Sequence, residues 1–119
     1  MMKGDRRRLY GQEHDFYELE GSVVMKLSPQ AALKVCLSAA KHGLVVARIE
    51  GGIWHDPGFE ARYDCIWNGA DPPLSAEAAT LNNILAAAFI EQESQMHDAF
   101  ILTAPPITGW PHKLIKESK

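Results

Sequence analysis

The sequence predicts an α+β fold, a ferredoxin-like βαββαβ sandwich with two helices on one face of a four-stranded antiparallel sheet. Runs that alternate with a period of two, typical of half-buried strands, are interspersed with runs whose apolar residues recur every three to four positions, as in amphipathic helices. Their order, strand–helix–strand–strand–helix–strand, is that of the split βαβ motif. An α+β sandwich with a different strand order is the alternative, because the pattern defines the layers better than the order.

The first strand and the first helix are predicted before residue 44. The strand signal covers residues 16–27 and is strongest at 22–27. Ser28 is a suitable N-cap and Pro29 a suitable first helical residue. Gly43 supplies the left-handed residue that ends a helix. The apolar stripe of this helix is assigned to Ala32, Val35, Cys36, Ala39 and Ala40.

An antiparallel hairpin over residues 44–68 is the most strongly patterned stretch. Two alternating runs, 45–50 and 59–68, are joined by a loop rich in glycine and proline. One face is apolar and is predicted to pack on the helices, and its members on the second run are Phe59, Ala61, Tyr63, Cys65 and Trp67. The other face is predicted to be open to solvent or to a partner, and it carries Arg48, Glu50, Glu60, Arg62 and Asp64.

A second helix is predicted from Ser75 to about Ser94, and a last strand at residues 99–103. The helix's apolar stripe is assigned to Leu81, Ile84, Leu85, Ala88 and Phe89, whereas Asn82 and Asn83 are placed on the solvent side. The prediction is thus a single α+β domain over residues 16–113, with a flexible N-terminal arm at 1–15 and a basic tail at 114–119.

Composition and charge exclude several classes of protein. Hydrophobic residues make up 46% and charged residues 23% of the chain, as in globular proteins. No apolar run approaches the length of a membrane span, and no secretory signal is recognised. Residues 25–112 hold five Lys/Arg and nine Asp/Glu, which argues against direct nucleic-acid binding and suits a basic protein partner. Cys36 and Cys65 are expected to be buried and reduced, so a cytoplasmic location is predicted.

Candidate partner-binding residues gather in the hairpin. Trp54, His55 and Asp56 occupy its loop, Glu60, Arg62 and Asp64 follow on the charged face, and Trp110 lies in a second loop with glycine and proline neighbours. Tryptophans held by such flanks suit binding anchors, because Trp is enriched at hot spots. The alternative is that each tryptophan folds back over an edge of the core.

A small ferredoxin-like enzyme, or a small-molecule or metal binder, is the alternative function. It would use His55, Asp56 and His97 as an acid–base or ligand set, which requires these side chains to be close together. No HxH, HExxH or CxxC motif supports this alternative. The sequence therefore predicts no catalytic residue, no metal site and no cofactor. A third hypothesis is a homodimer that pairs the open sheet faces.

A resemblance makes the binding hypothesis more concrete. Residues 25–113 resemble small bacterial immunity proteins of the contact-dependent growth inhibition or polymorphic toxin type, and the similar segments are Met25–Pro29, 51–73 and 101–113. The resemblance implies a non-enzymatic, acidic, cytoplasmic protein that binds a cognate toxin domain, often a basic nuclease. Such proteins block the toxin's active site or a surface adjacent to it.

Overall fold

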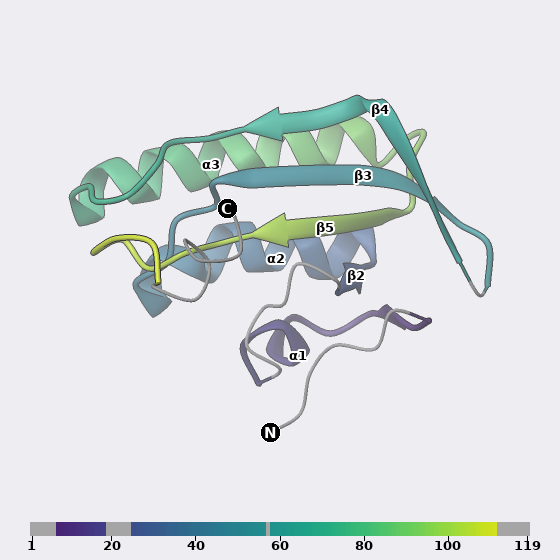
Figure 1. Cartoon of the computed structure of the whole chain (residues 1–119), viewed down its shortest axis with the longest axis horizontal. Coiled ribbons are helices and arrows are strands. Elements are labelled where there is room, and N and C mark those ends of the chain that lie inside the picture. Colours follow the sequence, from purple (N-terminus) through teal and green to yellow (C-terminus); the bar gives the residue numbers. More distant parts are fainter. Residues whose placement is uncertain (1–6, 19–24, 57, 112–119) are drawn as a thin grey trace.

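Five strands form one mixed sheet, and two long helices lie side by side against one of its faces (Figure 1). This computed structural model describes residues 7–18, 25–56 and 58–111. The strands are β1 (Leu9–Tyr10), β2 (Lys26–Leu27), β3 (Arg48–Trp54), β4 (Phe59–Asn68) and β5 (Ala99–Thr103). The helices are α1 (Glu13–Glu18), α2 (Pro29–Ser38), which continues into the 3-10 turn η1 (Ala39–His42), and α3 (Ala76–Glu93).

The strand order is β1-β2-β5-β3-β4, so the predicted ferredoxin-like arrangement is wrong, although the α+β class is confirmed. In a ferredoxin-like sheet, the strand before the first long helix would lie between the last strand and the second strand of the central hairpin, antiparallel to both. Here β5 instead lies between β2 and β3 and runs antiparallel to both. Four of the five residues of β5 are buried, which requires a central position that the order of elements along the chain does not reveal.

The N-terminal segment adds a fifth strand and a short helix. β1, which falls within the predicted flexible arm, pairs in parallel with β2. Residues 16–18 belong to α1 and not, as predicted, to a strand; Phe16 is buried in the core. Its neighbour Tyr17 bonds through its hydroxyl to Ser38 Oγ at 2.6 Å. These contacts with α2 outweigh the preference of aromatic residues for strands. The predicted strand residues 19–24 and the tail at 114–119 lie outside the described residues.

The first predicted helix is confirmed together with both of its ends. The backbone N–H of Ala31 donates to Ser28 Oγ at 3.2 Å, and Pro29 occupies the first helical position. Gly43 has a φ of 72° and its N–H donates to the carbonyl of Ala40, which closes the last turn. All members of the predicted stripe except Ala40 are buried.

Gly43→Ala is expected to lower the free energy of unfolding by about 1–2 kcal/mol, because a Cβ is disfavoured at positive φ. No atom lies within 4 Å of the position that this Cβ would take, so the effect would come from the backbone alone. Urea unfolding measures it. The control is Gly11→Ala, also free of neighbours within 4 Å but outside the left-handed region, with an expected change within about 0.5 kcal/mol. Equal losses in the two variants would contradict the argument.

α3 has the predicted extent but buries the opposite face. Its N-cap is Ser75 and its C-cap is Ser94. The predicted stripe is largely in solvent, with exposed fractions of 65% for Leu81 and 62% for Leu85. The buried residues are Ala79, Asn82, Asn83, Ala86, Ala87 and Ile90. Both faces of α3 carry apolar residues, and the face of small side chains lets the helix approach its neighbours closely.

Asn82 and Asn83, predicted to face solvent, attach α3 to the chain before β3. Asn83 Oδ1 accepts from the N–H of Val46 at 2.9 Å, and its Nδ2 donates to the carbonyl of Leu44 at 3.1 Å. Asn82 Nδ2 donates to the carbonyl of Val46 at 2.9 Å, and its Oδ1 accepts from the N–H of Ala70 at 2.8 Å. The two amides therefore satisfy backbone groups that would otherwise be buried without partners.

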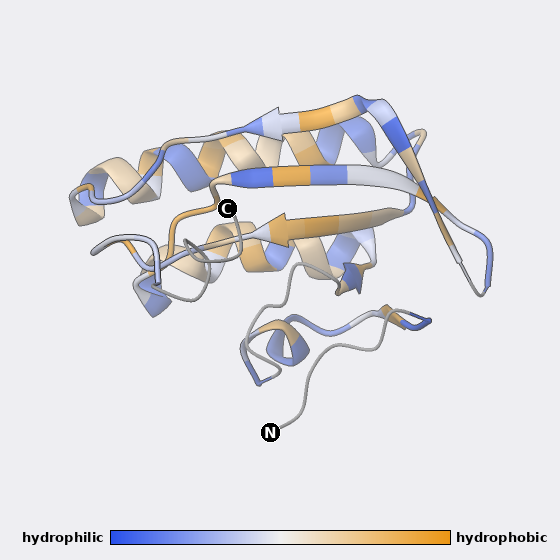
Figure 2. Ribbon diagram, viewed as in Figure 1, coloured by the Kyte–Doolittle hydropathy of each residue, from blue (hydrophilic) through white to orange (hydrophobic). Residues whose placement is uncertain are grey.

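The core lies between the sheet and the helices. Figure 2 shows the apolar character of β5, which runs through the middle of the sheet. The largest fully buried side chains include Phe16, Met25, Leu27, Ile49, Ile90, Phe100 and Leu102. Within the part of the chain that the structure describes, no helix has the length and apolar character needed to cross a membrane.

Candidate partner-binding surface

An irregularity in the β3–β4 hairpin determines which side chains of β4 reach solvent. Glu50 pairs with Ile66, but Gly52 already pairs with Ala61, so residues 62–65 of β4 lie opposite Gly51 alone. Such a bulge bends a strand and redirects its side chains. β4 turns sharply near this region (Figure 1), and the hairpin continues past the end of the helix layer.

The predicted apolar face of β4 is in the core only in part. Cys65 is fully buried and Trp67 packs partly buried against the core. Ala61 and Tyr63 are exposed, and Phe59 is half-buried, so the prediction is wrong for these residues. The bulge is the physical reason, because it interrupts the period of two on which the assignment to one face depends.

Three charged or titratable side chains form a network at the tip of the hairpin. His55 Nε2 lies 2.7 Å from Glu60 Oε1, and Arg62 Nε lies 3.0 Å from Glu60 Oε2. The hydrogen bond from His55 and the charge of Arg62 hold the pKa of Glu60 below its usual range. Exposed ion pairs contribute little to stability. Breaking this network would therefore cost the free protein little stability.

Hydrogen bonds also hold the described residues on either side of position 57 in the hairpin loop. The backbone N–H of Trp54 donates to Asp98 Oδ1 at 2.8 Å, which ties the end of β3 to the start of β5. The N–H of His55 donates to the carbonyl of Gly58 at 2.8 Å and closes the turn. Asp56 is exposed with a φ of 40°, a conformation that Asp tolerates better than most residues.

Trp110 is not part of this surface. The chain just before it bonds to the segment before β3: the N–H of Val45 donates to the carbonyl of Pro105, and the N–H of Ile107 to the carbonyl of Gly43. Trp54 lies at the other end of β3. The structure thus brings Trp54, His55, Asp56 and Glu60 together at the hairpin tip, with Arg62 and Asp64 exposed further along β4.

Sequence reasoning missed Tyr63, which was assigned to the core. Its side chain is 96% exposed, between the exposed residues Arg62 and Asp64. Tyrosine is enriched at the centres of protein interfaces, where it acts as a rigid, amphipathic anchor. An alternating sequence contains no signal of the bulge that turns this residue outward.

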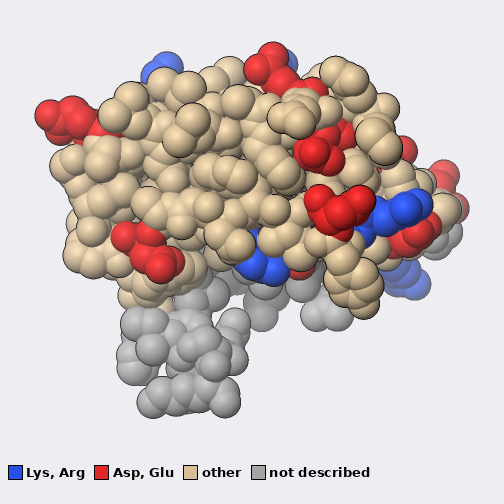
Figure 3. All heavy atoms as spheres, turned by 90° about the horizontal axis from the view of Figure 1, so that it is seen from above, with Lys and Arg blue, Asp and Glu red and all other residues tan. Residues whose placement is uncertain are grey.

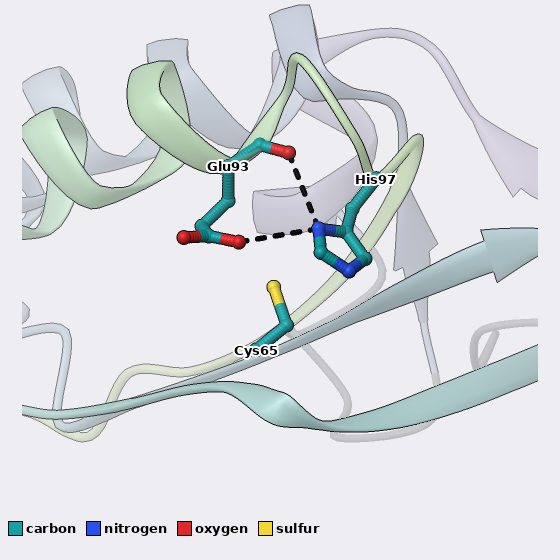
Figure 4. A group of neighbouring side chains, drawn as sticks. All are labelled: Cys65, Glu93 and His97. Carbon is teal, nitrogen blue, oxygen red and sulfur yellow. Dashed lines mark hydrogen bonds and ion pairs between the residues drawn. The ribbon is translucent and has the colours of Figure 1, made fainter.

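His97 belongs to a different group of side chains from His55. His97 Nδ1 lies 3.2 Å from Glu93 Oε1 and 3.3 Å from the Glu93 carbonyl oxygen, and Cys65 lies next to them (Figure 4). Burial, reinforced by the nearby Glu93 carboxylate, raises the pKa of the Cys65 thiol to about 12. The ring of His55 bonds to Glu60 and the ring of His97 bonds to Glu93, so His55, Asp56 and His97 do not form one hydrogen-bonded site among the described residues.

A shallow pocket of 320 Å³ lies between α1 and α2. The rings of Tyr17 and His42 stack beside it with their centroids 3.7 Å apart, and His14 and Lys34 also line it. It contains none of the candidate residues that the sequence suggested.

The face that carries β4 and α3 is richer in acidic than in basic side chains (Figure 3). Toward the right of this view, where the hairpin lies, acidic and basic groups are neighbours, as the pairing of Glu60 with Arg62 requires. Over residues 25–112, nine Asp/Glu stand against five Lys/Arg. Acidic side chains therefore outnumber basic ones on this face and over residues 25–112 as a whole.

Comparison with known proteins identifies the family. The model of the family described as colicin-E5 Imm protein matches residues 25–104. This chain belongs to the colicin E5 immunity protein family. It is 62% identical over 109 residues to the immunity protein CdiI of Burkholderia pseudomallei, a match that covers 92% of this chain and 100% of that protein. It is 40% identical over 80 residues to the colicin-E5 immunity protein of Escherichia coli, covering 66% of this chain and 96% of that protein.

The predicted immunity role is thereby confirmed: this immunity protein is a toxin-neutralising binding protein, and the enzyme alternative is not favoured. The family match begins at Met25 and includes β2 to β5, α2 and α3. β1, α1 and the pocket beside α1 involve residues before this match. The hairpin network and Tyr63 lie within it.

Proposed function

We propose that this immunity protein binds its toxin through the hairpin end of the sheet, with Tyr63 as the central anchor. Around it would lie the side chains that the sequence suggested for partner binding, Trp54, His55, Asp56, Glu60, Arg62 and Asp64. The observation that carries the proposal is the bend in β4, which exposes 96% of a tyrosine among charged residues. Trp110 is left out because the chain before it bonds at the opposite end of β3.

The partner is proposed to be a basic domain, such as a nuclease, and the inhibition to be non-catalytic. The excess of acidic side chains over residues 25–112 supports this, because complementary charge speeds association and disfavours wrong partners. The free cysteines Cys36 and Cys65 suit a reducing compartment, so we place the protein's action in the cytoplasm.

Tyr63→Ala is expected to weaken binding to the cognate toxin domain by about 30-fold, the effect of losing one hot-spot residue. Calorimetry with the purified toxin domain measures the affinity, and growth of cells that produce the toxin measures protection. Because Tyr63 is almost fully exposed, its loss should leave the urea midpoint of the free protein unchanged.

Leu81→Ala is the matched control, since Leu81 is also a large exposed side chain but lies on α3. It is expected to bind and protect like the parent protein. Glu60→Lys should also weaken toxin binding, because it reverses a charge within the proposed surface. If Tyr63→Ala and Glu60→Lys both kept full affinity and Leu81→Ala lost affinity, the toxin would bind on the helix layer and the proposal would be refuted.

A further inference from the structure

The side chains of Cys65, Glu93 and His97 converge from separate segments of the fold. Cys65 comes from the bulge of β4, Glu93 from the last turn of α3, and His97 from the connection between α3 and β5. Their potential ligand atoms, a sulfur, a carboxylate oxygen and a ring nitrogen, all lie within 4.8 Å of one another. Figure 4 shows the three groups pointing toward a common centre. Cys65 and His97 are buried, whereas Glu93 is partly exposed and leaves a route from solvent.

We propose that Cys65, Glu93 and His97 bind one Zn²⁺ ion. Thiolate, imidazole and carboxylate are the three side-chain ligands of zinc in proteins, and a set of three leaves a fourth position for water. Two ligands at about 2.0–2.1 Å on a tetrahedral zinc are roughly 3.3 Å apart. His97 Nδ1 and Glu93 Oε1 are already 3.2 Å apart, so a metal between them requires little movement.

The charges of the cluster match a divalent cation. A Cys65 thiolate and the Glu93 carboxylate carry two negative charges, which Zn²⁺ neutralises, while His97 binds as neutral imidazole. The ion would thus be buried without leaving a net charge in the interior. In binding, a zinc–sulfur bond replaces the Cys65 S–H bond, and the proton passes to solvent. The expectation of no metal site, drawn from the sequence, depended on the absence of a local motif; here the ligands come from distant positions.

The packing around the Cys65 sulfur supports a preformed metal site. A Cβ on residue 51 would lie 2.3 Å from Cys65 Sγ, so only glycine leaves room for the sulfur at this point of β3. The backbone of Gly51 also hydrogen-bonds to the Cys65 sulfur. Outer contacts of this kind orient metal ligands and tune their affinity. The other such group in the described residues, His14, Asp15 and Glu18, has no buried member and no thiol.

The test uses the full-length protein, freed of metal by chelation and titrated with Co²⁺ and then Zn²⁺. We expect one equivalent of Co²⁺ to give a thiolate-to-cobalt charge-transfer absorption that Zn²⁺ abolishes, and Zn²⁺ to raise the melting temperature. Cys65→Ser should abolish the absorption, and Glu93→Gln and His97→Gln should each weaken binding by about tenfold or more. Cys36→Ala and His14→Asn, which leave the cluster intact, should bind like the parent.

A parent protein without the charge-transfer absorption would overturn the proposal, as would an absorption that survives Cys65→Ser or disappears in Cys36→Ala. Far-ultraviolet circular dichroism checks that each variant is folded. If Cys65→Ser fails to fold, the Co²⁺ affinity of Glu93→Gln tests the proposal instead. This variant is expected to fold, because Glu93 is partly exposed and the amide oxygen of the glutamine can still accept a hydrogen bond from His97. No measurement here involves the toxin, so this proposal stands or falls independently of the binding surface.

Discussion

Asn83→Leu is expected to lower the free energy of unfolding by about 2–5 kcal/mol, although it replaces a polar residue on a helix by an apolar one of similar size. Asn83 is buried, and its amide group satisfies both the N–H of Val46 and the carbonyl of Leu44. Leucine can do neither, so two backbone groups would be buried without partners, at about 1–3 kcal/mol each. Chemical denaturation followed by circular dichroism measures the change.

Asn68→Leu provides the control for this substitution. Asn68 is exposed at the end of β4, and its side chain accepts only from Arg48 among the hydrogen bonds resolved for the described residues, at 2.8 Å. The same chemical change there is expected to alter stability by no more than about 0.5 kcal/mol. A small effect of Asn83→Leu, or one no larger than that of Asn68→Leu, would show that the amides do not hold α3 in place.

Ile90→Ala is expected to cost about 2–5 kcal/mol, whereas Leu85→Ala should cost less than about 1 kcal/mol. Both residues lie on α3, but Ile90 is 1% exposed within the core and Leu85 is 62% exposed. The larger loss at Ile90 comes from lost transfer free energy plus the cavity left behind. Thermal or urea unfolding of the two variants compares the two faces of the helix directly. The reverse ranking would mean that α3 packs through the stripe that its sequence suggests.

Local signals in the sequence were sufficient to locate most elements of the fold. Ser28, Gly43 and Ser75 mark helix ends that the structure confirms. The alternating run over residues 59–68 has the same first and last residues as β4. These features depend on a few neighbouring residues and on backbone conformation. They are therefore visible in a chain before any tertiary contact is known.

The features that were not predicted depend on contacts between distant segments. α3 has apolar residues on both sides, and its orientation is decided by the fit of its small residues and by Asn82 and Asn83, whose partners lie more than ten positions away. Tyr63 fits the alternating apolar pattern of residues 59–68, which assigns it to the core. A bulge opposite Gly51 nevertheless turns it outward. The grouping of Cys65 with His97 likewise joins β4 to the segment that follows α3.

The bulge has a consequence for self-association as well. β4 is ten residues long and forms an edge of the sheet, so one side of its backbone could serve as a template for a strand of another molecule. The break in register at residues 62–65 bends that edge, and the exposed Glu60, Arg62 and Asp64 place charges along it. Bent, charged edges resist the addition of further strands. The same irregularity that exposes Tyr63 therefore also protects the protein against edge-to-edge aggregation at high concentration.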